Sequence, residues 1–275
     1  MTRVVLVSDS HLSARTPGAL ANWDAVVAYL DRERPDLVVH AGDITTDAPT
    51  HPDDLAVGRH ELTRPSCRVR VIPGNHDVGE NAFGSSAATV SRERLDRYRA
   101  ELGPDRWSLD LPGWRLIGLN VLLFGSGLDD EADQWQWLAG ALRARPLPRR
   151  IGVVVHKPWA ATPELPTDAR PARYLPPAAK ERLAALFSDA PVGLVVSGHV
   201  HQFSHHRRDG IDYLWVPSTW ATIPDDRQVT LGDKTCAVID LTLHEDGTHT
   251  AELQRPTGLA QHEIGTTLAD PYVGH

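Results

Sequence analysis

Five short clusters of residues that can bind metal ions are spread along the chain. They are Asp9-Ser10-His11, Gly42-Asp43, Gly74-Asn75-His76-Asp77, His156 and Gly198-His199-Val200-His201. Carboxylates, imidazoles and an amide oxygen, without thiolates, suit divalent cations such as Mn²⁺, Fe²⁺ or Zn²⁺. Two such ions about 3.5–4 Å apart can share a bridging carboxylate and make a shared water more acidic. These residue types therefore predict a site for divalent metal ions.

Each cluster follows an apolar run of strand length. The runs are residues 4–7, 37–40, 69–72, 151–155 and 192–196. In open α/β sheets, ligands bind beyond the carboxyl ends of the strands, where neighbouring loops meet. The two-residue spacing of Asp9 and His11, and of His199 and His201, places each pair on one side of an extended segment. A glycine that precedes a cluster allows a tight turn and a close approach between loops, so we expect the clusters to converge.

Segments with helical periodicity alternate with these runs over the first two thirds of the chain. The predicted helices are residues 19–34, 51–64, 91–102, 132–144 and 177–188, and a hairpin over 107–121 turns at Pro112-Gly113. Four later segments alternate like antiparallel strands, namely residues 205–208, 213–216, 235–243 and 248–253. The order predicts an α/β sandwich with either one mixed sheet or two packed sheets, and helices outside. We expect one domain over residues 1–255 and a tail, 256–275, that is either mobile or folded back over the body.

The composition restricts the partners and the location of the protein. The chain has 275 residues and a formal net charge of -8, which argues against binding a long nucleic acid strand. No stretch approaches the ~18 apolar residues of a membrane span, and the N-terminus lacks the features of a signal peptide. We therefore expect a cytoplasmic protein with reduced thiols at Cys67 and Cys236. The oligomeric state stays open, a homodimer included.

The five clusters, taken together and in this order, resemble the motif set of the calcineurin-like metallophosphoesterases. The matching positions are Asp9-x-His11, Gly42-Asp43, Gly74-Asn75-His76-Asp77, His156 and Gly198-His199-x-His201. A shorter stretch, Gly198–Gln202 followed by Val216–Thr219, is similar to the class III cyclic-nucleotide phosphodiesterase branch. The resemblance implies an α/β sandwich of two packed mixed sheets flanked by helices, with a dimetal site at the carboxyl ends of the strands.

The resemblance also implies roles for the residues of these motifs. It implies two groups of metal ligands joined by one bridging carboxylate: Asp9, His11 and His201 for the first ion, Asn75, His156 and His199 for the second, and Asp43 between them. The two ions would be Mn²⁺ or Fe²⁺/Fe³⁺, with Zn²⁺ also compatible. His76 would stabilise charge on the phosphate or protonate the leaving oxygen, and Asp77 would orient His76 or its loop.

Three residues near the motifs are candidate substrate contacts. Lys157 stands where close relatives often carry a second histidine. Its ammonium would either help to bind a second negative charge on the substrate phosphate or point at solvent. Trp159 and Trp220 would either wall the substrate cleft or pack within their loops.

The predicted activity is hydrolysis of a small phosphodiester, such as a cyclic nucleotide or a glycerophosphodiester, by a hydroxide that bridges the two metal ions. The substrate would be a small molecule. One alternative is a phosphomonoesterase that acts on a nucleotide, sugar or lipid phosphate, and Lys157 favours this alternative slightly. The other is a metal-free interaction module of the same fold.

Overall fold

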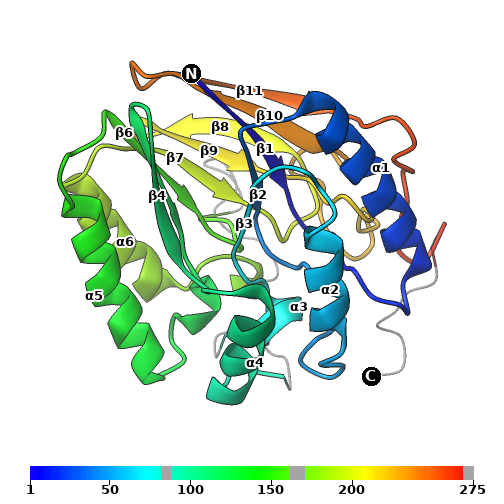
Figure 1. Cartoon of the computed structure of the whole chain (residues 1–275). Coiled ribbons are helices and arrows are strands. Elements are labelled where there is room, and N and C mark those ends of the chain that lie inside the picture. The colour runs from blue at the N-terminus through cyan, green and yellow to red at the C-terminus, as the bar shows by residue number, and fades with distance from the viewer. Residues whose placement is uncertain (82–87, 161–170, 269–275) are drawn as a thin grey trace.

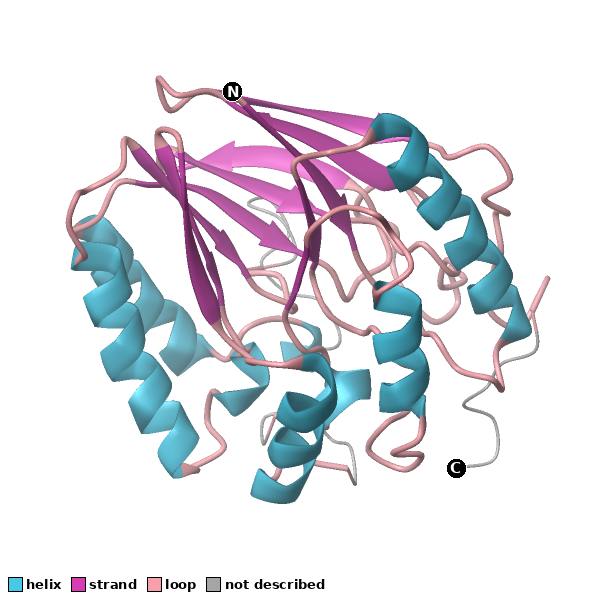
Figure 2. Ribbon diagram, in the orientation of Figure 1, coloured by secondary structure: helices cyan, strands magenta, loops and turns pink. Residues whose placement is uncertain are grey.

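Two β-sheets pack face to face, and helices lie on the outer sides of this pair (Figure 1, Figure 2). The computed structural model describes residues 1–81, 88–160 and 171–268. Both sheets mix parallel and antiparallel strands. The prediction of a two-sheet α/β sandwich is thereby confirmed, and the alternative of a single mixed sheet is wrong.

The first sheet contains β1 (Thr2–Val7), β2 (Leu37–His40), β3 (Val69–Val71), β10 (Val238–Leu243) and β11 (His249–Gln254). Their order across the sheet is β11-β10-β1-β2-β3. The central strand β1 pairs in parallel with β2 and antiparallel with β10. The three parallel strands β1, β2 and β3 therefore all end at the same edge of the sheet.

The second sheet contains β4 (Trp107–Leu111), β5 (Trp114–Gly118), β6 (Arg150–Val154), β7 (Val192–Ser197), β8 (Ser204–Arg208) and β9 (Ile211–Trp215). Their order is β4-β5-β6-β7-β9-β8. The predicted hairpin at Pro112-Gly113 joins β4 and β5, which are antiparallel. β9 is antiparallel to β8 and parallel to β7, which the alternating sequence did not distinguish.

The main helices are α1 (Pro17–Glu33), α2 (Asp54–Leu62), α4 (Arg92–Leu102), α5 (Asp129–Arg143) and α6 (Pro177–Ser188). Each overlaps a helix predicted from the sequence. Three further helical pieces are short: α3 (Asn75–Val78), η1 (Val121–Leu123) and η2 (Pro171–Arg173). Ser91 caps α4 as expected, because its hydroxyl accepts a hydrogen bond from the backbone N–H of Arg94.

The central strands are apolar on both faces because each face enters a different core. In β1, Val4 and Leu6 lie in the core between the two sheets, whereas Val5 and Val7 pack on the outer side with Trp23 of α1. This follows from the alternation of side chains along a strand. The buried strands thus form a base that is packed on both faces, and the loops of the site follow the ends of these strands.

The C-terminal segment folds back over the body as far as Leu268. The Asn22 side chain of α1 donates a hydrogen bond to the Ala260 carbonyl (3.0 Å) and accepts one from the Ala260 N–H (2.9 Å). Leu259 and Ile264 are buried. Of the two expectations for the tail, the folded-back one holds for residues 256–268, and residues 269–275 lie outside the described part.

None of the helices in the described ranges is long and apolar enough to span a bilayer. Cys67, which is half-buried, and the buried Cys236 are both free thiols.

Candidate metal centre

The loops that follow β1, β2, β6 and β7 bring two groups of metal-binding side chains together. One group contains Asp9, His11 and His201, and the other contains Asp43, His156 and His199. Within each group the ligand atoms all lie within 4.8 Å of one another. The predicted convergence of the clusters at the carboxyl ends of the strands is what the structure shows.

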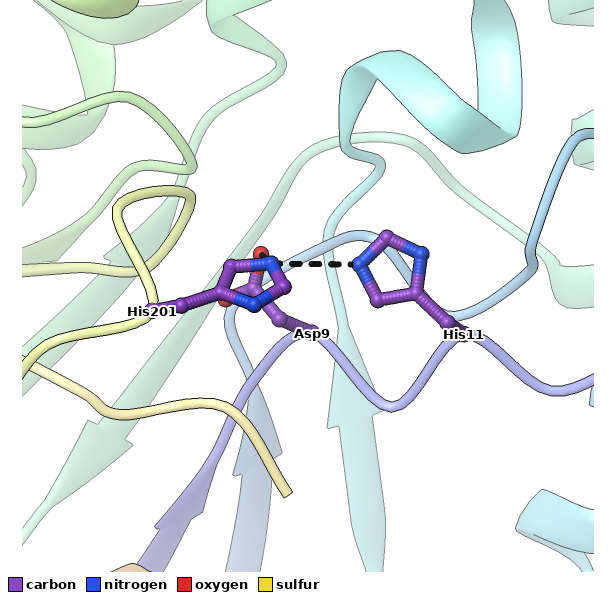
Figure 3. Close-up of side chains that lie close together, drawn as sticks. All are labelled: Asp9, His11 and His201. Carbon is purple, nitrogen blue, oxygen red and sulfur yellow. Dashed lines mark hydrogen bonds and ion pairs between the residues drawn. The ribbon is translucent and has the colours of Figure 1, made fainter. Parts of the chain in front are cut away.

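The first group is drawn in Figure 3. His201 Nε2 lies 3.4 Å from Asp9 Oδ1 and 3.3 Å from His11 Nε2 (Figure 3). All three side chains are almost completely buried. Their nitrogen and oxygen atoms point toward one another, so they surround a small space (Figure 3).

The second group is arranged around His156. Its Nε2 atom lies 3.1 Å from Asp43 Oδ2, 3.2 Å from Asn75 Oδ1 and 3.2 Å from His199 Nδ1. Asp43 Oδ2 is also 4.0 Å from His11 Nε2 of the first group. Asn75 therefore joins the second group, and Asp43 lies between the two groups, where the resemblance requires a bridging carboxylate.

Hydrogen bonds to the backbone show which ring nitrogens are available for a metal. His156 Nδ1 lies 2.9 Å from the Ala41 carbonyl, and His201 Nδ1 lies 2.6 Å from the Ala221 carbonyl. A carbonyl only accepts, so each ring donates its Nδ1–H, and Nε2 of the neutral ring carries a lone pair. This arrangement is common in histidines that bind metal.

A cation fits among these atoms. The His156 lone pair faces oxygens of Asp43 and Asn75, which are also acceptors. The Asp43 carboxylate favours positive charge at this position: burial lowers the pKa of His156, but Asp43 outweighs this effect and raises the pKa to about 9. Burial holds the pKa of His11 and His199 well below the usual value, which keeps both rings neutral. The donor set therefore fits divalent metal ions.

The backbone of the ligands adopts a conformation that is uncommon for their residue types. Positive φ values occur at Asp9 (51°), His11 (48°), Asp43 (53°), His199 (70°) and His201 (52°). Seven non-glycine residues of the described ranges have positive φ, and five of them are these ligands. Such strain collects at functional sites, where the surrounding fold holds it in place.

Two glycines allow the loops to approach one another. A Cβ atom on Gly74 would lie 2.1 Å from Asp43 Oδ1, and a Cβ atom on Gly198 would lie 1.9 Å from Ser8 Oγ and 2.6 Å from Asp9 Oδ2. All three distances are far below van der Waals contact. The close approach predicted for the glycines that precede the clusters is therefore observed.

His76 lies beside the first group of ligands and is half-exposed. Its backbone N–H donates to Asp43 Oδ1 (2.8 Å), and its ring packs edge-on against the His11 ring, with centroids 4.9 Å apart. The ring therefore borders the metal centre without belonging to either ligand group. Its role toward a substrate stays a prediction.

Asp77 is buried and organises two of the loops. It accepts hydrogen bonds from the backbone N–H groups of Gly74 (2.8 Å), Thr45 (2.8 Å) and Ile44 (3.2 Å). Burial and the charge of Asp43 raise the pKa of Asp77 to about 6. Asp77 thus ties the Asp43 loop to the Asn75 loop, which agrees with a positioning role.

A cavity of about 180 Å³ opens on the metal centre. Four ligands and His76 line one side of it, and the other side is formed by Arg173, Ile223, Arg227, Gln228 and Ile264. The Arg173 guanidinium donates to the Arg227 carbonyl (2.7 Å), which links the two segments. Sequence reasoning missed this side, because these residues come from the short helix η2, from irregular loops and from the folded-back C-terminal segment.

Lys157 lies elsewhere than expected. The side chain is fully buried, and its Nζ atom donates to Glu80 Oε1 (2.5 Å) and to the Ala172 carbonyl (2.6 Å). It neither points at solvent nor lines the cavity. This position does not support the prediction that Lys157 contacts a substrate directly. Its hydrogen bond to the Ala172 carbonyl instead holds the residue that precedes Arg173.

The two candidate tryptophans pack within the fold. Trp220 is 2% exposed, and its ring centroid lies 4.7 Å from that of His11. Trp159 packs against Phe187 and Tyr213, with centroid distances of 5.9 and 6.0 Å. Both positions agree with the packing alternative, and contact with a substrate stays a prediction.

Two packed mixed sheets that carry adjoining groups of aspartate, asparagine and histidine ligands define a metallophosphoesterase. The calcineurin-like phosphoesterase family matches residues 2–203, and the chain belongs to this family. The resemblance seen in the sequence is thereby confirmed. The narrower likeness to the class III branch stays a prediction.

Known proteins agree with this assignment. The chain is 27% identical over 239 residues to a UDP-2,3-diacylglucosamine hydrolase of Ralstonia nicotianae, covering 79% of this chain and 83% of the relative. A dimetal phosphatase from Danio rerio has a similar structure, with a TM-score of 0.64, 16% identity, and coverage of 93% of this chain and 96% of the phosphatase. A purple acid phosphatase from yellow lupin gives a TM-score of 0.62 at 15% identity, over 95% of this chain and 52% of that protein. At these identities the structural likenesses show the fold.

Proposed function

We propose that this phosphoesterase hydrolyses a small phosphodiester, of the cyclic-nucleotide or glycerophosphodiester type. The observation that carries the proposal is the compact cavity of about 180 Å³ that opens directly on both ligand groups. Lys157 also bears on the choice. Its ammonium could have bound the second negative charge of a phosphomonoester, but it forms an ion pair with Glu80 inside the protein.

The residues of the centre have distinct roles in this proposal. The first ion would be held by Asp9, His11 and His201, the second by Asn75, His156 and His199, and Asp43 would bridge them. Bound there, two divalent cations supply an acidified water and neutralise charge on the phosphoryl oxygens. Mn²⁺ and Fe²⁺/Fe³⁺ are the metals we expect, and Zn²⁺ also suits these ligands. His76 borders the same cavity, from which its ring can donate a proton to the leaving oxygen.

A phosphomonoesterase is the second candidate, and a specific observation favours it. Arg173 and Arg227 line the cavity opposite the ligands, and a monoester carries one more negative charge than a diester. Guanidinium groups bind phosphate oxygens in a bidentate manner. The Ralstonia relative is named for UDP-2,3-diacylglucosamine, which is a diphosphate diester and not a monoester, so this compound is tested as a separate substrate.

Rates with Mn²⁺ distinguish the two candidates. We would compare bis(p-nitrophenyl) phosphate, p-nitrophenyl phosphate, 3′,5′-cyclic AMP and UDP-2,3-diacylglucosamine at equal concentrations. The proposal predicts faster hydrolysis of the diester, with turnover of cyclic AMP. Faster hydrolysis of the monoester would overturn it in favour of the phosphatase. Absence of bound metal and of turnover on every compound would support the metal-free module.

A further inference from the structure

Three more side chains that can bind a metal lie together outside the catalytic centre. They are His205 on β8, Asp212 on β9 and His249 on β11, and their ligand atoms all lie within 4.8 Å of one another. We propose that they form a second, independent site for one divalent cation of the Zn²⁺ type, which ties the two sheets together. Imidazole and carboxylate ligands suit such an ion.

The strand registers place this cluster at the opposite edge of the sheets from the catalytic centre. Asp212 pairs with Leu194, near the start of β7, whereas His199 and His201 follow the end of that strand. His249 pairs with Leu243 of β10, which in turn pairs with the first residue of β1. The proposed site is therefore distinct from the dimetal centre.

The observed distances are close to those of a tetrahedral zinc site. His205 Nε2 lies 3.3 Å from Asp212 Oδ1, and His249 Nε2 lies 3.8 Å from Asp212 Oδ2. Metal–ligand bonds of about 2.0–2.1 Å at tetrahedral angles place ligand atoms about 3.4 Å apart. Small side-chain movements would complete the site, with water in the remaining position.

The surroundings hold two of the ligands in place. Arg207 donates to Asp212 Oδ2 (3.0 Å), which leaves Oδ1 facing His205. An outer hydrogen bond of this kind is usual for a carboxylate that binds metal. The ring of Trp114 packs edge-on against His249, with centroids 5.6 Å apart. Arg207 adds a positive charge that opposes a cation, but its side chain is 64% exposed and is therefore well screened by water.

Such an ion would stabilise the sandwich. β8 and β11 are edge strands of different sheets, and the β10–β11 hairpin lies beside β8 and β9 (Figure 1). An ion held by both sheets binds the folded chain and not the unfolded one, so it adds stability by mass action.

Zinc content tests the proposal. The full-length protein would be stripped with a chelator, dialysed against buffered Zn²⁺ and analysed for zinc per chain. We expect His205→Gln and His249→Gln to bind one equivalent less than the wild type. The control is His60→Gln, because His60 is an exposed histidine on α2, and this variant should bind as much zinc as the wild type. Hydrolysis of bis(p-nitrophenyl) phosphate should be unchanged in all three variants.

Thermal unfolding gives a second readout. Added Zn²⁺ should raise the Tm of the wild type and of His60→Gln more than that of His205→Gln. His205 is the more exposed of the two histidines, so we expect its replacement to leave the fold intact. Equal zinc content and equal Tm shifts in the wild type and the two cluster variants would overturn the proposal and leave the three residues as an ion-pair cluster.

Discussion

His76 is the residue whose contribution to the chemistry can be separated most cleanly from metal binding. Its ring lies against the His11 ring and borders the cavity, but it belongs to neither ligand group. A residue in that position can protonate the leaving oxygen, and general acid catalysis typically contributes about 10²–10⁴-fold to the rate.

His76→Asn should therefore lower kcat by about 10²–10⁴-fold on cyclic AMP while the metal content stays unchanged. The loss should be smaller on bis(p-nitrophenyl) phosphate, because p-nitrophenolate leaves without a proton. Steady-state kinetics on both substrates, with metal analysis, checks this. Equal losses on the two substrates would argue for charge stabilisation by His76 instead of proton transfer.

The sequence identifies residue 157 as a lysine, but it does not show where the side chain of Lys157 points. The sequence places it beside His156, and only the fold shows that its ammonium is buried against Glu80 and the Ala172 carbonyl. Removing one partner of a buried ion pair leaves the other charge uncompensated, which costs about 3–5 kcal/mol.

Lys157→Met should lower the free energy of unfolding by about 3 kcal/mol, measured by urea denaturation. The double variant Lys157→Met/Glu80→Gln should recover part of this loss, because no charge is then left unpaired. If Lys157→Met were as stable as the wild type and changed only substrate preference, the ammonium would be acting on the substrate and not on the fold.

Among the structural elements, the loops of the site can pack closely only because glycines follow the strands. A Cβ atom on Gly198 would collide with Ser8 Oγ and Asp9 Oδ2, so the β1 and β7 loops could not both keep their positions. Gly140 is the matched contrast, because it lies within α5 and a Cβ there would meet nothing within 4 Å.

Gly198→Ala should destabilise the protein by about 1–3 kcal/mol and weaken metal binding, because Asp9 must shift. Gly140→Ala should be neutral or stabilise it by about 0.5–1 kcal/mol, since alanine favours a helix. Denaturation and metal analysis of both variants check this. A Gly198→Ala protein that kept normal stability and metal content would show that the loop contact can relax.

The elements themselves were largely predictable. Apolar runs and helical periodicity placed β2 and α6 at their observed bounds, because buried strands and amphipathic helices follow simple patterns. The motif order indicated which side chains would meet. The positive φ values of the ligands could not be predicted, because long-range packing imposes them on aspartate and histidine. Arg173 and Arg227 were missed because a single helical turn and a loop turn are too short to show a period.

At the scale of the whole molecule, the C-terminal segment completes the wall of the cavity. Ile264 lines the cavity and packs with Trp220 and Ala19, while Ala260 is bonded to Asn22 of α1. The segment therefore contributes both to stability and to the shape of the site.

A chain ending at Arg255 should unfold at a lower temperature than one ending at Leu268, because the buried Asn22 amide loses its Ala260 partners at a cost of about 1–3 kcal/mol. It should also show a changed KM, because the cavity loses the Ile264 wall. Thermal unfolding and kinetics on bis(p-nitrophenyl) phosphate check both effects. The same Tm and KM for the two chains would mean that the segment contributes neither to stability nor to substrate binding.

In the proposed mechanism, Asp43 would join two metal ions into one hydrolytic centre. Its Oδ2 atom lies 3.1 Å from His156 Nε2 of one ligand group and 4.0 Å from His11 Nε2 of the other. The most direct test measures manganese per chain and turnover of bis(p-nitrophenyl) phosphate in the wild type and in Asp43→Ala. We expect about two equivalents of manganese and turnover for the wild type, and loss of both for the variant. Wild-type turnover by Asp43→Ala would contradict this mechanism.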